Sequence, residues 1–263
     1  MCGIAGFSLE PEGIGIDPTD LARVLLAGLC ERGKDATGVA WQGPSGPVEL
    51  YKESRRVVHV FDRIAVPHEA RTVAVHVREY TKGTPALNEN NHPIRWAEVV
   101  GVHNGSISND DALFEQYGER RSSRTISVDS EAIMMLASVL GDLGAALAQV
   151  RGSAAVALMR DDRPGHLELA RRSRRPLVLA KAPGIVLFAS TREPLELVAR
   201  AARLRLTYED VGEGTAIEVA RGREVSRRQF DVDPRYPGTP APTYSSPAEK
   251  RTLVLLALAS LGA

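Results

Sequence analysis

The amino terminus of this chain is an unbroken run of small and apolar residues, CGIAGFSL at positions 2–9, which predicts a short buried strand. Chain termini are usually frayed and tolerant of change. A first strand of this kind must instead be pinned inside the fold, and one of only two cysteines in the chain stands at its start, at position 2. The fold therefore has to bury its own beginning, together with the thiol that this beginning carries.

Short apolar strands and amphipathic helices make up most of the remaining chain. A helix is predicted over residues 17–33, with Asp17 or Thr19 as its cap and Gly33 as its end, and two helices separated by a glycine are predicted over 127–150. Strands are predicted at 37–43, 48–53, 71–78, 97–105 and 215–222, and a further helix at 193–204. Four more strand-like segments, at 152–160, 166–172, 176–182 and 184–190, are joined by short turns and predict an antiparallel meander. The fold class is therefore α+β, with mostly antiparallel sheets covered by helices.

Length and composition narrow the class of protein. The 263 residues, 43% of them hydrophobic, are enough for one large domain or two small ones. The 33 basic residues balance the 33 acidic ones, which argues against a nucleic-acid or membrane-surface binder. We expect neither a secretory leader nor a membrane span. Two cysteines without metal-ligand spacing predict no disulfide framework and no metal site, so a cytoplasmic protein is expected.

The carboxyl-terminal end of the chain has a different character. Residues 232–247 contain five prolines and no helical or strand period, which is typical of a linker or an extended surface tail. Residues 248–263 predict a short apolar helix that packs on this domain, on a second copy of the chain or on a partner chain. We therefore divide the chain into a domain over 1–230 and a tail with a helix over 231–263, through which a homo-oligomer can form.

Polar clusters end or interrupt the predicted strands. They are Cys2, RGKDATG at 32–38, HVREYTKG at 76–83 and HNGSISN at 103–109, with Asp129 at a helix start. Each alone is ordinary, because a buried cysteine is usually a small hydrophobic residue and glycine-rich turns usually serve the backbone. Only their combination indicates chemistry.

Together these residues can form an N-terminal-nucleophile site. Once the initiator methionine is removed, Cys2 carries both a thiol and an α-amine, whose ordinary pKa of about 7.7–8.0 suits a general base. The side-chain amide of Asn104 and the backbone N–H of Gly105 can donate hydrogen bonds to an oxyanion. Arg78 can clamp a carboxylate of the substrate, and Asp129 can hold its ammonium group.

In order and spacing, MCGIAGF, RGKDATG, HVREYTKGTP…NNHPI, HNGSISN and VDSEAI resemble the glutaminase domain of class II glutamine amidotransferases, a family that includes glucosamine-6-phosphate synthase and glutamine phosphoribosylpyrophosphate amidotransferase. The resemblance covers roughly residues 2–220. It implies a four-layer αββα N-terminal-nucleophile hydrolase sandwich of two antiparallel sheets. It also implies hydrolysis of L-glutamine to glutamate and ammonia without a metal or an organic cofactor.

The resemblance also implies a role for each matched residue. Cys2 is the nucleophile with its α-amine as base, Asn104 and Gly105 form the oxyanion hole, Arg78 binds the α-carboxylate of glutamine, and Asp129 binds its α-amine. Further residues are expected to support the site: Arg32 and Gly33 beneath the nucleophile, His76 and Thr81 around the substrate, and His92 as an organiser of its loop.

The chain departs from the family's pattern HTRWATHG at several positions, among them Glu79, Tyr80 and Lys82, which replace tryptophan, alanine and the second histidine. That tryptophan lies towards the ammonia passage in the glucosamine-6-phosphate synthase branch, so the same channel is not expected here. The family usually fuses its glutaminase to a synthase domain, for which these residues carry no motif. We therefore expect a separate synthase partner or a specialised amide substrate.

Two other features have ordinary interpretations. Cys30 falls among leucines on a predicted helix and is expected to be a buried structural thiol. The run RRSRRP at 171–176 can grip phosphate or an acidic partner, but its place before a strand favours a solvated turn. Two alternatives to glutamine hydrolysis stay open: an amidohydrolase that cleaves a γ-glutamyl conjugate by the same mechanism, and a non-catalytic domain that senses glutamine.

Overall fold

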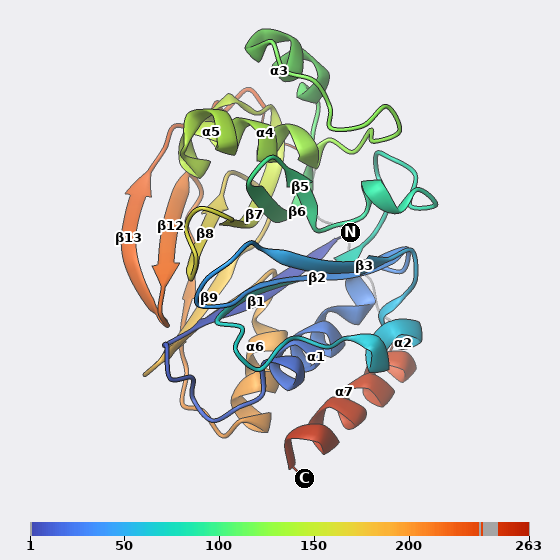
Figure 1. The fold of residues 1–263 in the computed structure, drawn as a ribbon, viewed down its shortest axis with the longest axis vertical. Helices are drawn as coiled ribbons and strands as arrows, with labels where there is room; N and C mark the ends of the chain where they lie inside the picture. Colours follow the sequence, from blue (N-terminus) through green and yellow to red (C-terminus); the bar gives the residue numbers. More distant parts are fainter. Residues whose placement is uncertain (1, 237, 239–246, 263) are drawn as a thin grey trace.

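Two antiparallel sheets that pack face to face form the centre of the molecule (Figure 1). The computed structural model describes residues 2–236, 238 and 247–262. Within these residues one sheet has the strand order β11-β9-β10-β1-β4-β2-β3 and the other the order β13-β12-β8-β7-β6-β5. The strands of the first sheet are β1 (Gly3–Leu9), β2 (Ala36–Gln42), β3 (Glu49–Glu53), β4 (Thr72–Arg78), β9 (Val178–Ala182), β10 (Ile185–Ala189) and β11 (Thr207–Asp210). Those of the second are β5 (Ile94–Trp96), β6 (Val99–Ile107), β7 (Gly152–Arg160), β8 (His166–Arg171), β12 (Thr215–Ala220) and β13 (Arg223–Gln229).

Helices cover the outer faces of both sheets, which gives four layers in the order αββα (Figure 1). The first sheet carries α1 (Pro18–Leu29) and α6 (Arg192–Ala201), with α7 (Pro247–Gly262) packed against α1, and the second sheet carries α4 (Ser130–Leu140) and α5 (Leu143–Gln149). The shorter elements are α2 (Val57–Val60), α3 (Asp110–Tyr117) and the 3-10 turns η1 (Cys30–Arg32), η2 (Phe61–Arg63) and η3 (Asn88–Asn90). The predicted α+β sandwich is confirmed.

The first strand is buried in the middle of its sheet, as its apolar sequence predicts. β1 pairs antiparallel with β10 on one side and with β4 on the other. Gly6 shows how tightly it is enclosed, because a Cβ atom there would lie 2.1 Å from the carbonyl oxygen of Val73 and 2.5 Å from the ring of Phe188. Ile4 faces the second sheet, whereas Phe7 faces the helical layer. The start of the chain is thus enclosed from both sides.

The helix predicted over residues 17–33 consists of α1 followed by the turn η1. Asp17 caps it by accepting a hydrogen bond from the backbone nitrogen of Thr19 at 2.8 Å, and Pro18 occupies the first turn, where its missing N–H is not needed. Cys30, in η1, is a buried free thiol, as the sequence predicts. Gly33 follows η1 and ends the helical segment.

The predicted meander over residues 152–190 is wrong. β7 and β8 pair in the second sheet, whereas β9 and β10 pair in the first, so residues 171–176 cross from one sheet to the other. The run RRSRRP is therefore not a solvated turn: Arg172 is fully buried and Arg175 is 5% exposed. Arg172 donates hydrogen bonds to backbone carbonyl oxygens, among them that of Tyr236 at 2.8 Å, which explains how a guanidinium group is accommodated inside. The edge strands β11 and β13 were not predicted, because their side chains are largely exposed and charged.

The carboxyl-terminal helix α7 packs against α1 of the same chain (Figure 1). Leu253 and Ala257 are buried in that contact. The ammonium group of Lys250 lies between the carboxylates of Glu31, at 3.0 Å, and Glu193, at 2.6 Å, and so joins α7 to η1 and α6. The helix therefore completes the outer layer beside the turn that leads to Gly33.

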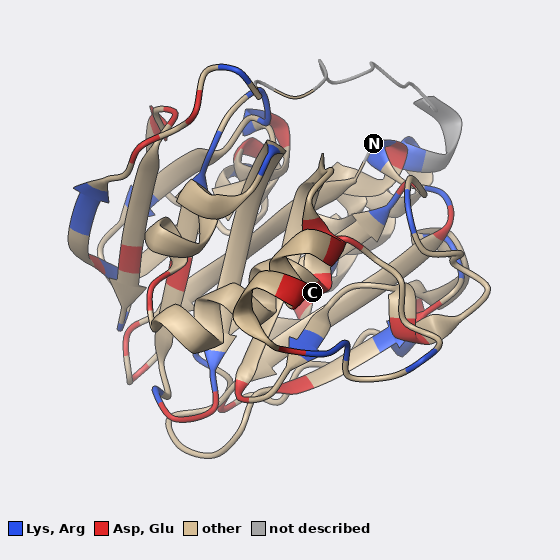
Figure 2. Ribbon diagram, turned by 90° about the horizontal axis from the view of Figure 1, so that it is seen from above, with Lys and Arg blue, Asp and Glu red and all other residues tan. Residues whose placement is uncertain are grey.

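Acidic and basic residues are interspersed over the ribbon in the view of Figure 2. In the described part of the chain, no helix combines the length and the apolar character that a membrane crossing requires. The predicted extended tail at 232–247 lies largely outside the described residues, which include 232–236 and 238.

Candidate active site

The main candidate residues converge at one end of the space between the two sheets. Successive side chains of a strand point to opposite faces of its sheet. Three residues of the core between the sheets mark the inner faces of β1, β4 and β6: Ile4, Ala74 and Val102. Cys2 lies two residues before Ile4, Arg78 lies four residues after Ala74, and Asn104 lies two residues after Val102. Their side chains therefore face the same space.

Cys2 stands directly before β1 and is 8% exposed. Its Sγ atom donates a hydrogen bond to the backbone carbonyl oxygen of Glu79, 3.4 Å away. Burial raises the pKa of the Cys2 thiol above its ordinary value, and the nearby Arg78 guanidinium opposes this shift without reversing it. The thiol is therefore protonated at neutral pH and needs a base before it can act as a nucleophile.

Arg78 ends β4 with its guanidinium group 2% exposed and held by the loop that follows. Nη1 donates to Oδ1 of Asn91 at 2.5 Å, and Nη2 donates to the carbonyl oxygens of Lys82 at 2.8 Å and Gly83 at 2.5 Å. Burial lowers the pKa of Arg78, but a guanidinium group remains charged in proteins. Within the described residues these bonds leave Nε and one N–H of Nη1 for a further acceptor, such as a substrate carboxylate.

Asp129 precedes α4 and is 2% exposed, yet its carboxylate does not cap that helix. Oδ2 instead accepts a hydrogen bond from the backbone nitrogen of Ile107, at the end of β6, 2.8 Å away. The two preceding backbone nitrogens, of Ser127 and Val128, both donate to Oδ1 of Asn90, at 2.8 and 3.1 Å. A buried carboxylate and a buried guanidinium group thus flank the site, an arrangement suited to the two charges of an α-amino acid.

Asn104 is fully buried on β6, and its side chain meets Ser190 across the gap between the sheets. Ser190 Oγ lies 3.3 Å from Asn104 Nδ2 and also accepts a hydrogen bond from the backbone nitrogen of Ile4 at 3.0 Å. In this orientation Oδ1 of Asn104 has no partner among the described residues. The opposite orientation of the amide gives Oδ1 a partner, because the Ser190 hydroxyl then donates to it. It also leaves Nδ2 as a donor for an oxyanion.

Gly105 follows Asn104, and no other residue type fits at this position. A Cβ atom there would lie 2.0 Å from the carbonyl oxygen of Ser153 and 2.4 Å from Nε2 of His103. The backbone at residue 105 is thus packed between β7 and a buried imidazole ring.

Arg32 and Gly33 lie beneath the start of β1. A Cβ atom on Gly3 would come within 3.1 Å of the Arg32 side chain, and one on Gly33 would lie 2.6 Å from backbone atoms of Arg78. Burial lowers the pKa of Arg32, and the proximity of the Cys2 sulfur opposes that shift. The absence of a side chain at Gly33 thus lets η1 approach the end of β4.

His76 belongs to a stack of three buried histidines rather than to the surface of the site. The rings of His76 and His92 are stacked with their centroids 4.1 Å apart, and the ring of His103 meets that of His92 edge-on at 6.5 Å. Burial lowers the pKa of all three imidazoles, so the rings are neutral. Thr81, in contrast, is exposed. The structure therefore places these predicted residues apart, with the two histidines inside and the threonine outside.

Several residues that support this site were not singled out from the sequence: Asn90, Asn91, Arg175 and Ser190. Arg175 comes from the crossing at 171–176; burial lowers its pKa and the nearby Cys2 sulfur raises it. The paired asparagines inside a polar loop were a visible signal. Nothing local distinguishes a buried arginine in RRSRRP from its exposed neighbours, because the crossing between sheets decides which one turns inwards.

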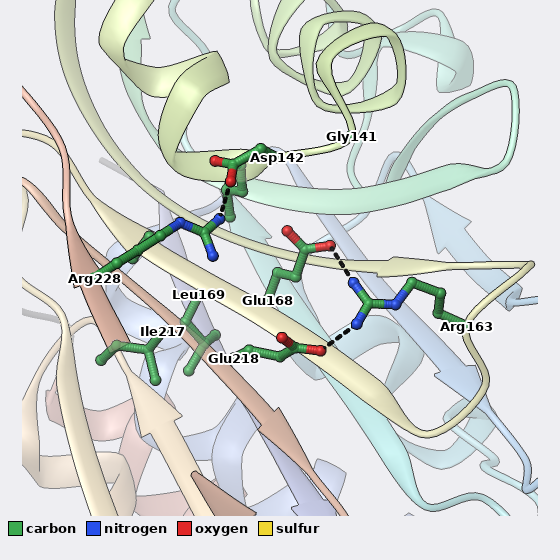
Figure 3. Close-up of a pocket in the computed structure, with 10 residues that line it drawn as sticks. Gly141, Asp142, Arg163, Glu168, Leu169, Ile217, Glu218 and Arg228 are labelled. Carbon is green, nitrogen blue, oxygen red and sulfur yellow. Dashed lines mark hydrogen bonds and ion pairs between the residues drawn. The ribbon is translucent and has the colours of Figure 1, made fainter. Parts of the chain in front are cut away.

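A separate cavity of about 60 Å³ lies beside the start of α5, against β8 and β12 (Figure 3). Its charged side chains point at one another: Arg228 pairs with Asp142 at 2.5 Å, and Arg163 pairs with Glu218 at 2.5 Å. None of the predicted site residues lines it. Across the described ranges, no group of three or more histidine, cysteine, aspartate or glutamate residues is placed to hold a metal ion.

Comparisons with known proteins show what the chain is similar to. Residues 84–196 match the model of a glutamine amidotransferase domain. The chain is 30% identical over 258 residues to the glutamine–fructose-6-phosphate aminotransferase (isomerizing) of Shigella flexneri, and 31% identical over 257 residues to that of Haemophilus ducreyi. Over most of its length this chain is similar to class II glutamine amidotransferase domains. The alignments cover 90% and 89% of the chain but only 40% of each relative.

Solved structures share the fold of this chain. Glutamine phosphoribosylpyrophosphate amidotransferase from B. subtilis, complexed with ADP and GMP, superposes with a TM-score of 0.68 at 18% identity over 88% of this chain and 50% of that one. A structure of the allosteric regulatory enzyme of purine biosynthesis gives 0.71 at 19% identity over the same shares. The predicted N-terminal-nucleophile hydrolase sandwich is confirmed as the fold.

Three departures from the pattern that the chain resembles, at Glu79, Tyr80 and Lys82, lie in the segment after β4. The carboxylate of Glu79, which replaces tryptophan, pairs with Lys34 at 3.2 Å, and Lys34 is 64% exposed. Lys82, which replaces histidine, donates to Oδ2 of Asp110 at 2.5 Å. Charged pairs therefore occupy positions where the family pattern has aromatic side chains.

Proposed function

We propose that this chain is a glutamine amidotransferase that hydrolyses L-glutamine to glutamate and ammonia through a thioester on Cys2. The observation that carries the proposal is the burial of Cys2 at the end of the inter-sheet space, towards which Arg78 and Asn104 also face. In this proposal Arg78 binds the α-carboxylate of glutamine and Asp129 its α-ammonium group. Asn104 and Gly105 donate to the oxyanion, and no cofactor takes part.

The reaction then runs in two stages. Removal of the initiator methionine frees the α-amine of Cys2, which takes the thiol proton that burial otherwise retains. Sγ attacks the side-chain carbonyl carbon of glutamine, and the electron pair moves onto the oxygen, where Asn104 and Gly105 stabilise it. The C–N bond breaks, and the amine returns the proton to the leaving ammonia. Water, deprotonated by the same amine, attacks the thioester, releasing glutamate and the free thiol.

The two cysteines offer a matched test. Cys2→Ala and Cys2→Ser should abolish glutamate release, whereas Cys30→Ala should retain it, because Cys30 lies buried in η1. Intact-mass analysis should show loss of the initiator methionine and one adduct of 6-diazo-5-oxo-L-norleucine, located by peptide mapping at residue 2. Unchanged turnover in Cys2→Ala would sink the proposal.

We infer that the ammonia goes to a separate synthase chain. The support is the similarity to glutamine–fructose-6-phosphate aminotransferases, whose names state a transfer of the amino group. Leu255 and Leu256, on the outer side of α7, are 68% and 52% exposed and are the proposed contact for a second copy. Replacing both with glutamate should convert a dimer to a monomer in light scattering, and an unchanged mass would refute this contact. Glutaminase assays with and without candidate synthases test the ammonia transfer.

A γ-glutamyl conjugate is the second candidate substrate. The observation that favours it is the Lys34–Glu79 pair. The backbone carbonyl oxygen of Glu79 accepts a hydrogen bond from Cys2, and the Lys34 side chain paired with the Glu79 carboxylate is 64% exposed, so a solvent-accessible charge lies close to the nucleophile. A panel of γ-glutamyl amides compared with glutamine separates the candidates: a conjugate with a kcat/KM above that of glutamine would favour the second, and the reverse order the first.

A further inference from the structure

Two consecutive asparagines in the loop between β4 and β5, Asn90 and Asn91, are fully buried. Each holds one side of the candidate site: Asn91 contacts Arg78, and Asn90 contacts the segment that leads into Asp129. Arg78 and Asp129 are the groups proposed above to hold the α-carboxylate and the α-ammonium group of glutamine, so the inference rests on that proposed function.

The side chain of Asn91 is fixed in one orientation. Oδ1 accepts a hydrogen bond from Nη1 of Arg78 at 2.5 Å. Nδ2 donates to Ser54 Oγ at 2.9 Å, to the carbonyl oxygen of Pro85 at 2.9 Å and to Oδ1 of Asn88 at 3.1 Å. Because these partners are acceptors, turning the amide over would lose the bonds on both sides. Oδ1 is therefore held towards the guanidinium group.

The side chain of Asn90 is fixed against a different segment. Its Oδ1 accepts from the backbone nitrogens of Ser127 and Val128, and its Nδ2 donates to the carbonyl oxygen of Thr84 at 3.3 Å. The two peptide groups held in this way come directly before Asp129. The orientation of these peptide groups sets where the chain enters α4, and with it the position of the Asp129 side chain.

The loop that carries both asparagines is itself anchored from the neighbouring β3. The ammonium group of Lys52 donates to the carbonyl oxygens of Asn91 at 2.7 Å and Pro93 at 2.9 Å. In return, Nδ2 of Asn88 donates to the carbonyl oxygen of Lys52 at 3.0 Å. These bonds are all made between groups of the protein, so they can organise the loop before a substrate binds, which reduces the entropy lost on binding.

We propose that Asn90 and Asn91 are positioning residues that fix the separation of the site's cation from its anion, and thereby select amides that carry an α-amino acid group. Asn91 acts through Arg78 on the substrate carboxylate, and Asn90 acts through the Asp129 segment on the substrate ammonium group. Adjacent residues of one rigid loop can do this because their side chains leave the backbone on different sides.

Substrate dissection separates this role from a structural one. The wild type and the variants Asn91→Asp and Asn90→Ala are assayed with L-glutamine, with glutaramate, which lacks the α-amine, and with 4-aminobutanamide, which lacks the α-carboxylate. Asn91→Asp places a carboxylate against Arg78 and should raise KM about tenfold to a hundredfold for the two substrates with a carboxylate, leaving 4-aminobutanamide within about twofold. Asn90→Ala should weaken glutamine and 4-aminobutanamide and spare glutaramate.

A binding readout keeps the test independent of turnover. Each compound's protection of Cys2 from iodoacetamide gives its Kd in the same variants, and the same pattern of losses is expected. Asn109→Ala is the matched control. The Asn109 side chain also makes two hydrogen bonds, to backbone groups of Gln149 and Arg151, but none to Arg78 or to the segment that leads into Asp129.

The outcomes distinguish the two proposals. If the wild type binds glutamine without hydrolysing it, the proposed function fails, while the pattern of Kd values still decides the role of the asparagines. Equal losses for all three compounds, or losses matched by Asn109→Ala, would overturn the positioning role. So would wild-type protection that is identical for all three compounds.

Discussion

Ser190 Oγ lies 3.3 Å from Nδ2 of Asn104 and 3.0 Å from the backbone nitrogen of Ile4, so one hydroxyl group joins the strand of the proposed oxyanion hole to the strand of the nucleophile. This hydroxyl is the group that orients the Asn104 amide. The orientation of the Asn104 side chain therefore depends on a residue more than eighty positions away in the sequence.

Ser190→Ala is expected to lower kcat for glutamine about tenfold with little change in KM, because a misoriented Asn104 amide donates poorly to the oxyanion. The substitution also leaves the Ile4 N–H unpaired, which costs about 1–3 kcal/mol of stability. Ser190→Thr keeps the hydroxyl and should restore most of kcat. Steady-state kinetics and thermal unfolding check both effects, and a wild-type kcat in Ser190→Ala would contradict the role given to the hydroxyl.

Gly33→Ala should damage both stability and glutamine binding. The new Cβ would lie 2.6 Å from backbone atoms of Arg78, which cannot yield as a side chain can. We expect about 1–3 kcal/mol of destabilisation and a raised KM. Gly43→Ala is the control, since a Cβ there would have its nearest neighbour at 3.6 Å. Urea unfolding of the two variants should separate them, and equal midpoints would show that the contact relaxes.

Arg175→Gln should raise the pKa of the Cys2 thiol further. Burial is the main cause of the raised pKa, and Arg175 lies near enough for its own pKa to respond to the sulfur. Removing a cation destabilises the thiolate, so the pH midpoint of alkylation by iodoacetamide should move upwards, and the rate at pH 8 should fall about threefold to tenfold. Arg174→Gln, on an exposed neighbour, should leave the midpoint unchanged. If the two variants had the same pH midpoint of alkylation, Arg175 would not stabilise the Cys2 thiolate.

The sequence was most informative where a local pattern has a local physical cause. The cap at Asp17, the buried strand after Cys2 and the apolar strands that carry Arg78 and Asn104 all follow from short-range rules. Ser190 and Arg175 could not be predicted in the same way, because their places depend on which sheet the crossing at 171–176 enters. Long-range packing makes that choice, and short-range patterns do not reveal it. For the same reason the predicted meander was wrong.

Leu253→Ala should destabilise the protein by about 2–3 kcal/mol, because the side chain is fully buried between α7 and α1 and its loss leaves a cavity. Leu256→Ala, on the exposed side of the same helix, should change the free energy of unfolding of the monomer, measured at low protein concentration, by less than about 0.5 kcal/mol. Thermal unfolding at several protein concentrations provides the comparison. Equal effects of the two substitutions would mean that α7 does not dock on its own chain.

Lys52 should make stability depend on pH in the alkaline range. Burial lowers its pKa from an ordinary 10.5 to about 8, and the nearby Arg78 guanidinium adds to the shift. Below pH 8 the folded and unfolded states both carry the proton, so the cost of the buried charge is felt in full. Between pH 8 and pH 10.5 the unfolded state binds more protons than the folded state, so the free energy of unfolding rises with pH.

Lys52→Met removes this titration while keeping the length of the apolar stem. The difference in unfolding free energy, wild type minus Lys52→Met, should therefore grow between pH 8 and pH 10 and stay constant from pH 6 to pH 7. Other titrating groups cancel in that difference, because they are common to both proteins. Urea unfolding at each pH measures it directly, and a difference that stays flat or falls above pH 8 would show that the Lys52 ammonium group keeps its ordinary pKa against the loop carbonyls.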